Sequence, residues 1–63
     1  MTNSVKIRKL MLDIQEKLGI ENTYKILTQI VISMEEKYNL QEEELIKQLE
    51  LILISIGGVV NYE

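Results

Sequence analysis

Hydrophobic residues recur at helical spacing along most of this chain. The first set lies three or four positions apart, at Ile7, Leu10, Met11, Ile14 and Leu18. Residues at this spacing share one face of a helix. Asn3 or Ser4 is a suitable N-terminal cap, and Gly19 can take the left-handed conformation that ends a helix. The pattern predicts a first helix over residues 4–18.

A wider apolar stripe follows over residues 22–38. Its positions are Tyr24, Leu27, Ile30, Val31, Met34 and Tyr38, with Ile26 and Ile32 at its edges. One neighbouring helix cannot cover a stripe of this width, so we expect a second helix that is buried on more than one side. Asn22 is its expected N-cap, and Asn39 is expected to end it, with Leu40 making the accompanying apolar contact.

A third helix is predicted over residues 41–56, and from residue 45 to 56 its apolar side chains lie almost all the way around. Three consecutive glutamates, 42–44, stand where the helix dipole favours anions, and they mark the start of a third helix. Gly57 is expected to end it in a left-handed conformation. A helix that is apolar on several sides requires cover from several neighbours. We therefore expect this helix to be the centre of the fold.

Two alternatives for the C-terminal half stay open. Leu49–Ile56 is rich in β-branched residues, and Gly57-Gly58 is a possible turn of a β-hairpin. We favour a helix, because apolar residues occupy consecutive positions instead of alternating, and an isolated hairpin is poorly stable. The second alternative is a single kinked helix from Asn22 to Ile56, since the predicted connection is very short.

The small size of the chain predicts self-association. A domain of 63 residues buries only about 60% of its unfolded surface, and such domains commonly rely on disulfides, a metal or another subunit. The chain has no Cys and no His, which leaves another subunit. We expect one all-α domain, residues 1–63, with two to three short helices per chain and a helical bundle completed by homodimerisation. The residues expected in the core or dimer contact are Leu45, Leu49, Leu51, Ile52, Leu53, Ile54, Ile56, Ile30 and Met34.

The same absences argue against catalysis. Without His or Cys, the chain lacks the usual general base, the thiol nucleophile and the common soft metal ligands. Glu35-Glu36 and the glutamates at 42–44 are better explained as solvated helix positions than as a cation site, because their spacing matches no calcium loop. We expect no enzyme activity, no catalytic or metal-binding residue and no cofactor.

Charge and hydropathy bear on partners and location. The formal net charge of −3 argues against nucleic acid as the main partner, although Lys6, Arg8 and Lys9 are candidate phosphate contacts. The apolar run Leu51–Val60 is too short to span a membrane, and no signal peptide is visible. We expect a cytoplasmic protein. The abundance of Ile, Lys, Asn and Glu indicates an AT-rich bacterial or phage genome.

The excess of apolar residues and the lack of catalytic groups predict a small regulatory protein. We expect an adaptor or inhibitor that forms a homodimer and binds a second protein of unknown identity, a bacterial or phage regulator. Residues 57–63 form a tail in which Val59, Val60 and Tyr62 either fold back on the bundle or contact that partner. One alternative is a DNA-binding transcriptional regulator that uses the basic N-terminal segment. Another is a structural oligomerisation module.

Overall fold

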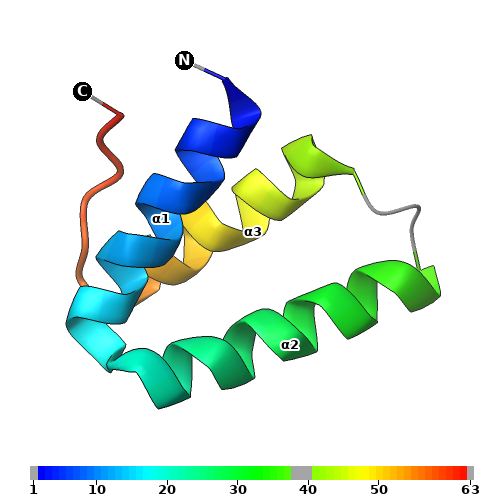
Figure 1. Ribbon diagram of the computed structural model, residues 1–63, viewed down its shortest axis with the longest axis horizontal. Helices are drawn as coiled ribbons and strands as arrows, with labels where there is room; N and C mark the ends of the chain where they lie inside the picture. The colour runs from blue at the N-terminus through cyan, green and yellow to red at the C-terminus, as the bar shows by residue number, and fades with distance from the viewer. Residues whose placement is uncertain (1, 38–40, 63) are drawn as a thin grey trace.

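The computed structural model describes residues 2–37 and 41–62, and these residues form three helices and no strand (Figure 1). Helix α1 spans Asn3–Leu18, α2 spans Ile20–Lys37 and α3 spans Glu42–Ser55. The expected all-α fold is confirmed. The β-hairpin alternative is wrong, because most of its first strand lies in α3. The predicted end of the second helix at Tyr38 and its cap at Asn39, with the Leu40 contact, lie outside the described residues.

The second and third helices are separate. Gln41, just before α3, has an extended backbone with φ −116° and ψ 139°, which interrupts helical hydrogen bonding. α3 then runs back across the molecule in roughly the opposite direction to α2 (Figure 1). The alternative of one kinked helix is therefore wrong. The three glutamates Glu42, Glu43 and Glu44 occupy the first turn of α3, as the sequence predicts.

The N-cap of α1 is Thr2, one residue before the earlier of the two predicted caps. The Thr2 backbone is extended, and its hydroxyl oxygen accepts a hydrogen bond from the Val5 backbone N–H at 3.3 Å. This contact satisfies one of the amide groups that a helix start leaves unpaired. At the other end, Gly19 has φ +86° and donates its N–H to the Gln15 carbonyl at 2.8 Å. The predicted helix end at Gly19 is confirmed.

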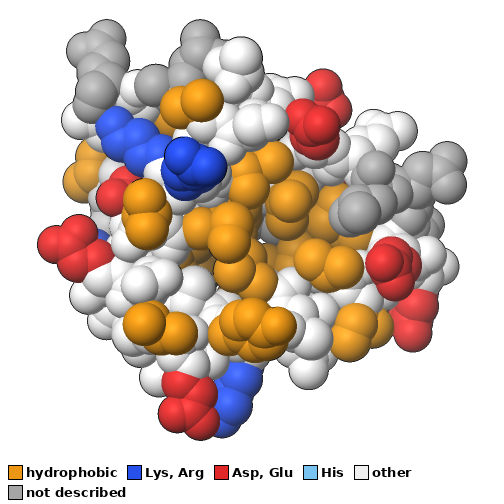
Figure 2. All heavy atoms as spheres, viewed as in Figure 1, with side chains coloured by type: hydrophobic (Ala, Val, Ile, Leu, Met, Phe, Trp, Pro, Cys, Tyr) orange, Lys and Arg blue, Asp and Glu red, His pale blue; other side chains and the backbone are white. Residues whose placement is uncertain are grey.

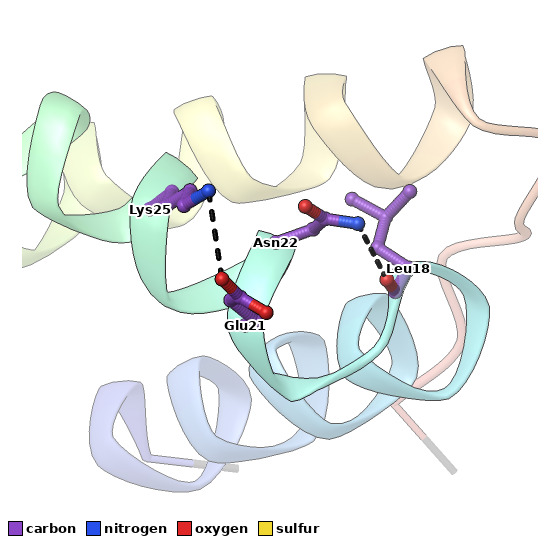
Figure 3. Close-up of polar contacts among 4 residues, drawn as sticks. All are labelled: Leu18, Glu21, Asn22 and Lys25. Carbon is purple, nitrogen blue, oxygen red and sulfur yellow. Dashed lines mark hydrogen bonds and ion pairs between the residues drawn. The ribbon is translucent and has the colours of Figure 1, made fainter.

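Helix α2 begins two residues earlier than predicted, directly after Gly19. The Gly19 carbonyl accepts hydrogen bonds from both the backbone N–H and the hydroxyl of Thr23, at 3.1 and 2.7 Å. Asn22 is therefore not an N-cap. Its side-chain amide instead donates to the Leu18 carbonyl at 3.2 Å, which connects the end of α1 to the start of α2 (Figure 3). The nearby ion pair between Glu21 and Lys25 is highly exposed and adds little stability.

The core lies between α1 and α3, which run in the same general direction (Figure 1). α3 packs most extensively against α1, and α2 meets α3 least. The central buried residues are Leu10 and Ile14 of α1 with Ile46, Leu49 and Leu53 of α3. The surrounding, partly buried residues are Ile7, Leu18, Leu27, Ile30, Leu45, Ile52, Ile56, Val60 and Tyr62. Each fully buried leucine contributes roughly 1.5–3 kcal/mol relative to an exposed one.

A tight turn after α3 reverses the chain. Gly57 has φ +89° and donates its N–H to the Ile54 carbonyl at 3.1 Å, and Gly58 donates to the Leu53 carbonyl at 2.8 Å. This pair of bonds is the Schellman motif, so the predicted role of Gly57 is confirmed. A Cβ atom on Gly58 would lie 2.8 Å from Leu53 Cγ. Glycine at position 58 therefore lets the following segment run closely across Leu53 and back along α1.

Candidate functional site

The structure divides the predicted core and dimer residues between the inside and the outside of the chain. Leu49, Leu53 and Met34 are buried. Four others are partly buried and pack against the core, namely Leu45, Ile52, Ile56 and Ile30. Leu51 and Ile54 are 54% and 58% exposed, on the side of α3 that faces away from the core. Most of the apolar residues of α3 therefore pack within the chain, and two of them, Leu51 and Ile54, remain on its surface.

The tail folds back onto the bundle. Val60 and Tyr62 pack against the core, whereas Val59 is 79% exposed. The Tyr62 hydroxyl donates a hydrogen bond to the Glu50 carboxylate of α3. The Lys6 ammonium lies 5.2 Å from the centre of the Tyr62 ring, a distance typical of a cation–π contact. Tyr62 thus connects the C-terminal segment to both α3 and α1.

The environment of Tyr62 keeps its hydroxyl protonated. Burial of the hydroxyl, its hydrogen bond to Glu50 and the negative charge of Glu50 together raise the pKa of Tyr62 to about 12. At neutral pH the side chain is therefore a neutral hydrogen-bond donor. This arrangement holds the tail in place, and it offers no acid or base that would work near neutral pH.

The three N-terminal cations do not form one surface. Residues two positions apart lie about 200° apart around a helix, so Lys6 and Arg8 project from opposite sides of α1. Lys6 lies over the Tyr62 ring, and Arg8 lines a depression elsewhere on α1. Lys9 is partly buried and makes a further contact of its own. The structure therefore does not gather the predicted phosphate contacts into a single patch.

The glutamate-rich segments also stay dispersed. Across residues 2–37 and 41–62, no group of three or more acidic side chains is placed to hold a metal ion. Glu43 accepts a hydrogen bond from the Asn3 amide at 3.4 Å, and Glu44 accepts one from Gln48 at 3.3 Å. These contacts lie at the start of α3 and one turn into it.

The outer side of α1 carries apolar residues that the sequence analysis did not select. Leu12 is 56% exposed and Val5 is 47% exposed. Beside them is an open depression of about 250 Å³, lined by Ser4, Ile7, Arg8, Met11, Leu12 and Gln15. Figure 2, viewed as Figure 1, shows hydrophobic side chains gathered mainly over the middle of the molecule, between α1 and α2, with basic side chains beside them toward α1. The spacing of seven between Val5 and Leu12 is the signal that could have identified this second stripe.

Exposed apolar residues lie on a surface of each of the three helices. We name two of these the α1 outer surface, containing Val5, Arg8, Leu12 and Glu16, and the α3 outer surface, containing Leu51 and Ile54. Among the described residues, no helix is both long and apolar enough to cross a membrane. Comparison with protein-family models, with curated proteins and with solved structures found no significant match.

Proposed function

We propose that this chain is a small, non-catalytic regulatory protein, an adaptor or inhibitor, that works as a homodimer and binds a second protein. The supporting observation is the exposure of Leu51 and Ile54 on the outer side of the helix whose Leu49 and Leu53 form the core. Adjacent exposed apolar residues on a small protein are candidates for an interaction site.

The α3 outer surface suits an amphipathic helix of the second protein. Leu51 and Ile54 are three residues apart, so they lie on adjacent turns and form one apolar strip. Lys47, also exposed, lies one turn before Leu51 and provides a cation at the end of this strip. A partner helix with apolar residues at matching spacing and a carboxylate at one end would complement it.

The proposed homodimer is supported by the apolar side chains that one chain leaves exposed to water. Large apolar side chains are exposed on α1, α2 and α3, including Leu12, Ile20 and Ile32. A 63-residue chain without disulfides has little stability to spare, and burial of such side chains against a second copy would add to it.

Partner binding is tested by capture and then by affinity. The wild-type chain and the Leu51→Glu variant serve as baits in extracts of the source organism, and any protein retained only by the wild type is purified. We expect that protein to bind the wild type at least tenfold more tightly than Leu51→Glu. Ile32→Glu on α2 is the matched control, because it places the same charge on another exposed apolar position. Equal binding by all three chains would contradict the proposal.

The dimer is tested by light scattering and thermal unfolding. A homodimer gives twice the chain mass at micromolar concentration, and its unfolding temperature rises with protein concentration. A single-chain mass together with a concentration-independent transition would remove the dimer from the proposal.

A further inference from the structure

We infer that the α1 outer surface forms the homodimer contact, with the α1 helices of two copies packed antiparallel and Arg8 of each copy paired with Glu16 of the other. This inference rests on the homodimer of the proposed function and assigns it a surface. Its basis is the order of charges and apolar residues along one row of α1.

Arg8, Leu12 and Glu16 occupy one row of the helix at steps of four residues. Arg8 and Glu16 are therefore equally distant from Leu12, about 6 Å along the axis in opposite directions. If a twofold axis passes through Leu12 of two antiparallel helices, position 8 of one copy comes beside position 16 of the other. Both contacts then join opposite charges. A parallel arrangement would instead bring Arg8 to Arg8 and Glu16 to Glu16.

Both charged groups are available for such a contact. Arg8 and Glu16 are exposed, and neither forms an ion pair with another described residue. Leu12, at the centre of the row, is among the most exposed apolar side chains of α1. Pairing with a second copy would cover this leucine and would bring each charge a partner without any change within the chain.

An open depression lies beside this row. Its lining belongs to two adjacent rows of α1, one with Ser4, Arg8 and Leu12 and the other with Ile7, Met11 and Gln15. With the twofold axis at Leu12, the two Leu12 rows face each other, and the 250 Å³ depression lies along one edge of the contact.

The ends of the contact are apolar as well. Val5 lies seven residues before Leu12, and Gly19 lies seven residues after it, at the turn into α2. In the antiparallel pair, Val5 of one copy comes near this turn of the other, where Ile20 is exposed. The sequence of contacts is then apolar, charged, apolar, charged and apolar, and it is symmetric about Leu12. Because this order is the same in both directions, the α1 outer surface is complementary to a second copy of itself.

The test is charge reversal followed by mixing. Arg8→Glu and Glu16→Arg each replace two attractive contacts in the dimer with two repulsive ones, so each variant should dimerise about tenfold more weakly than the wild type. An equimolar mixture of the two variants should recover a dimer with one chain of each, because both contacts then join opposite charges. The double variant Arg8→Glu/Glu16→Arg should also recover the wild-type dissociation constant.

Sedimentation equilibrium measures the dissociation constants, and native mass spectrometry identifies the mixed dimer. Glu36→Arg is the matched control, since it makes the same charge change at an exposed position on α2 and should leave dimerisation unchanged. If the wild type and both single variants dimerise with the same dissociation constant, the α1 contact is wrong, although the protein is still a dimer. Weakened variants that do not recover on mixing would overturn this contact too. A wild type that stays monomeric would reject the homodimer of the proposed function itself.

Discussion

Tyr62 donates a hydrogen bond to Glu50, and this contact joins the end of the described chain to the middle of α3. Tyr62 also packs against the core and carries the Lys6 ammonium over its ring. One side chain thus holds the C-terminal segment against two helices. Since few contacts stabilise so small a domain, the loss of any of them should be measurable.

Removal of the Tyr62 hydroxyl should destabilise the chain. Tyr62→Phe keeps the ring and its packing but leaves Glu50 without this donor. We expect the free energy of unfolding to fall by about 1 kcal/mol, as for a hydrogen bond that is partly exposed to water. Urea unfolding followed by circular dichroism measures it. Tyr24→Phe is the control, because Tyr24 is highly exposed and its hydroxyl forms no such contact with residues 2–37 or 41–62. Equal losses in both variants would contradict the assigned role of Tyr62.

The raised pKa of Tyr62 predicts a loss of stability at high pH. Its pKa is 10.0 when unperturbed and about 12 in the folded chain, so the unfolded chain releases this proton first. The stabilisation that Tyr62 provides is therefore complete below pH 10 and is lost as the pH rises from about 10 to 12. The difference in unfolding free energy between the wild type and Tyr62→Phe should shrink over this interval. A constant difference from pH 8 to 12 would rule out the coupling.

Leu49→Ala should unfold or severely destabilise the chain. Leu49 has no exposed surface and lies in the central cluster of α1 and α3. Truncation of such a side chain costs about 2–5 kcal/mol, which is a large part of the stability of a small domain. Thermal unfolding by circular dichroism is the measurement. Leu51→Ala makes the same chemical change at an exposed position of the same helix and should cost less than about 0.5 kcal/mol. Similar unfolding temperatures for both variants would mean that the core is misplaced.

The two glycines after α3 should differ in the reason they resist substitution. Gly57→Ala introduces a Cβ into open space, so its cost of about 1–2 kcal/mol arises from the positive φ of +89°. Gly58→Ala introduces a Cβ 3.0 Å from the Leu53 carbonyl oxygen and even closer to the Leu53 side chain. Leu53→Val shortens the side chain that this Cβ would meet, so Gly58→Ala should reduce the free energy of unfolding less in a Leu53→Val background than in the wild type. The cost of Gly57→Ala should be the same in both backgrounds. Unfolding free energies of the single and double variants provide the comparison.

The cap of α1 is also open to test. Thr2→Ala removes the hydroxyl oxygen that accepts the Val5 N–H, and it should reduce the free energy of unfolding by about 0.5–1 kcal/mol. Ser4 lies within the first turn of the helix and is not its cap, so Ser4→Ala should have little effect or slightly raise stability. Chemical denaturation of both variants distinguishes the observed cap from Ser4, one of the two predicted caps. A larger loss for Ser4→Ala than for Thr2→Ala would favour Ser4 as the cap.

The sequence alone determined the helices and where most of them end. Three-four spacing identifies α1 and α2, the three glutamates identify the start of α3, and Gly19 and Gly57 identify two helix ends. These features depend on contacts between residues a few positions apart, so they can be recognised without knowing the fold. The predicted start of α2 at Asn22 is wrong for a local reason as well. Gly19 ends α1 through its N–H, and its carbonyl accepts the first helical hydrogen bond of α2 from Thr23.

Only the tertiary structure decided which apolar residues face inward. Helix α3 has apolar residues on nearly every side. The spacing of these residues therefore does not distinguish Leu49 and Leu53, which are buried, from Leu51 and Ile54, which are exposed. The direction in which α1 crosses α3 makes that choice. Likewise, Tyr62 meets Glu50 and Lys6 only because the turn at Gly57 returns the tail along α1. These contacts join residues far apart in the chain, and their energies depend on three-dimensional packing that no local pattern specifies.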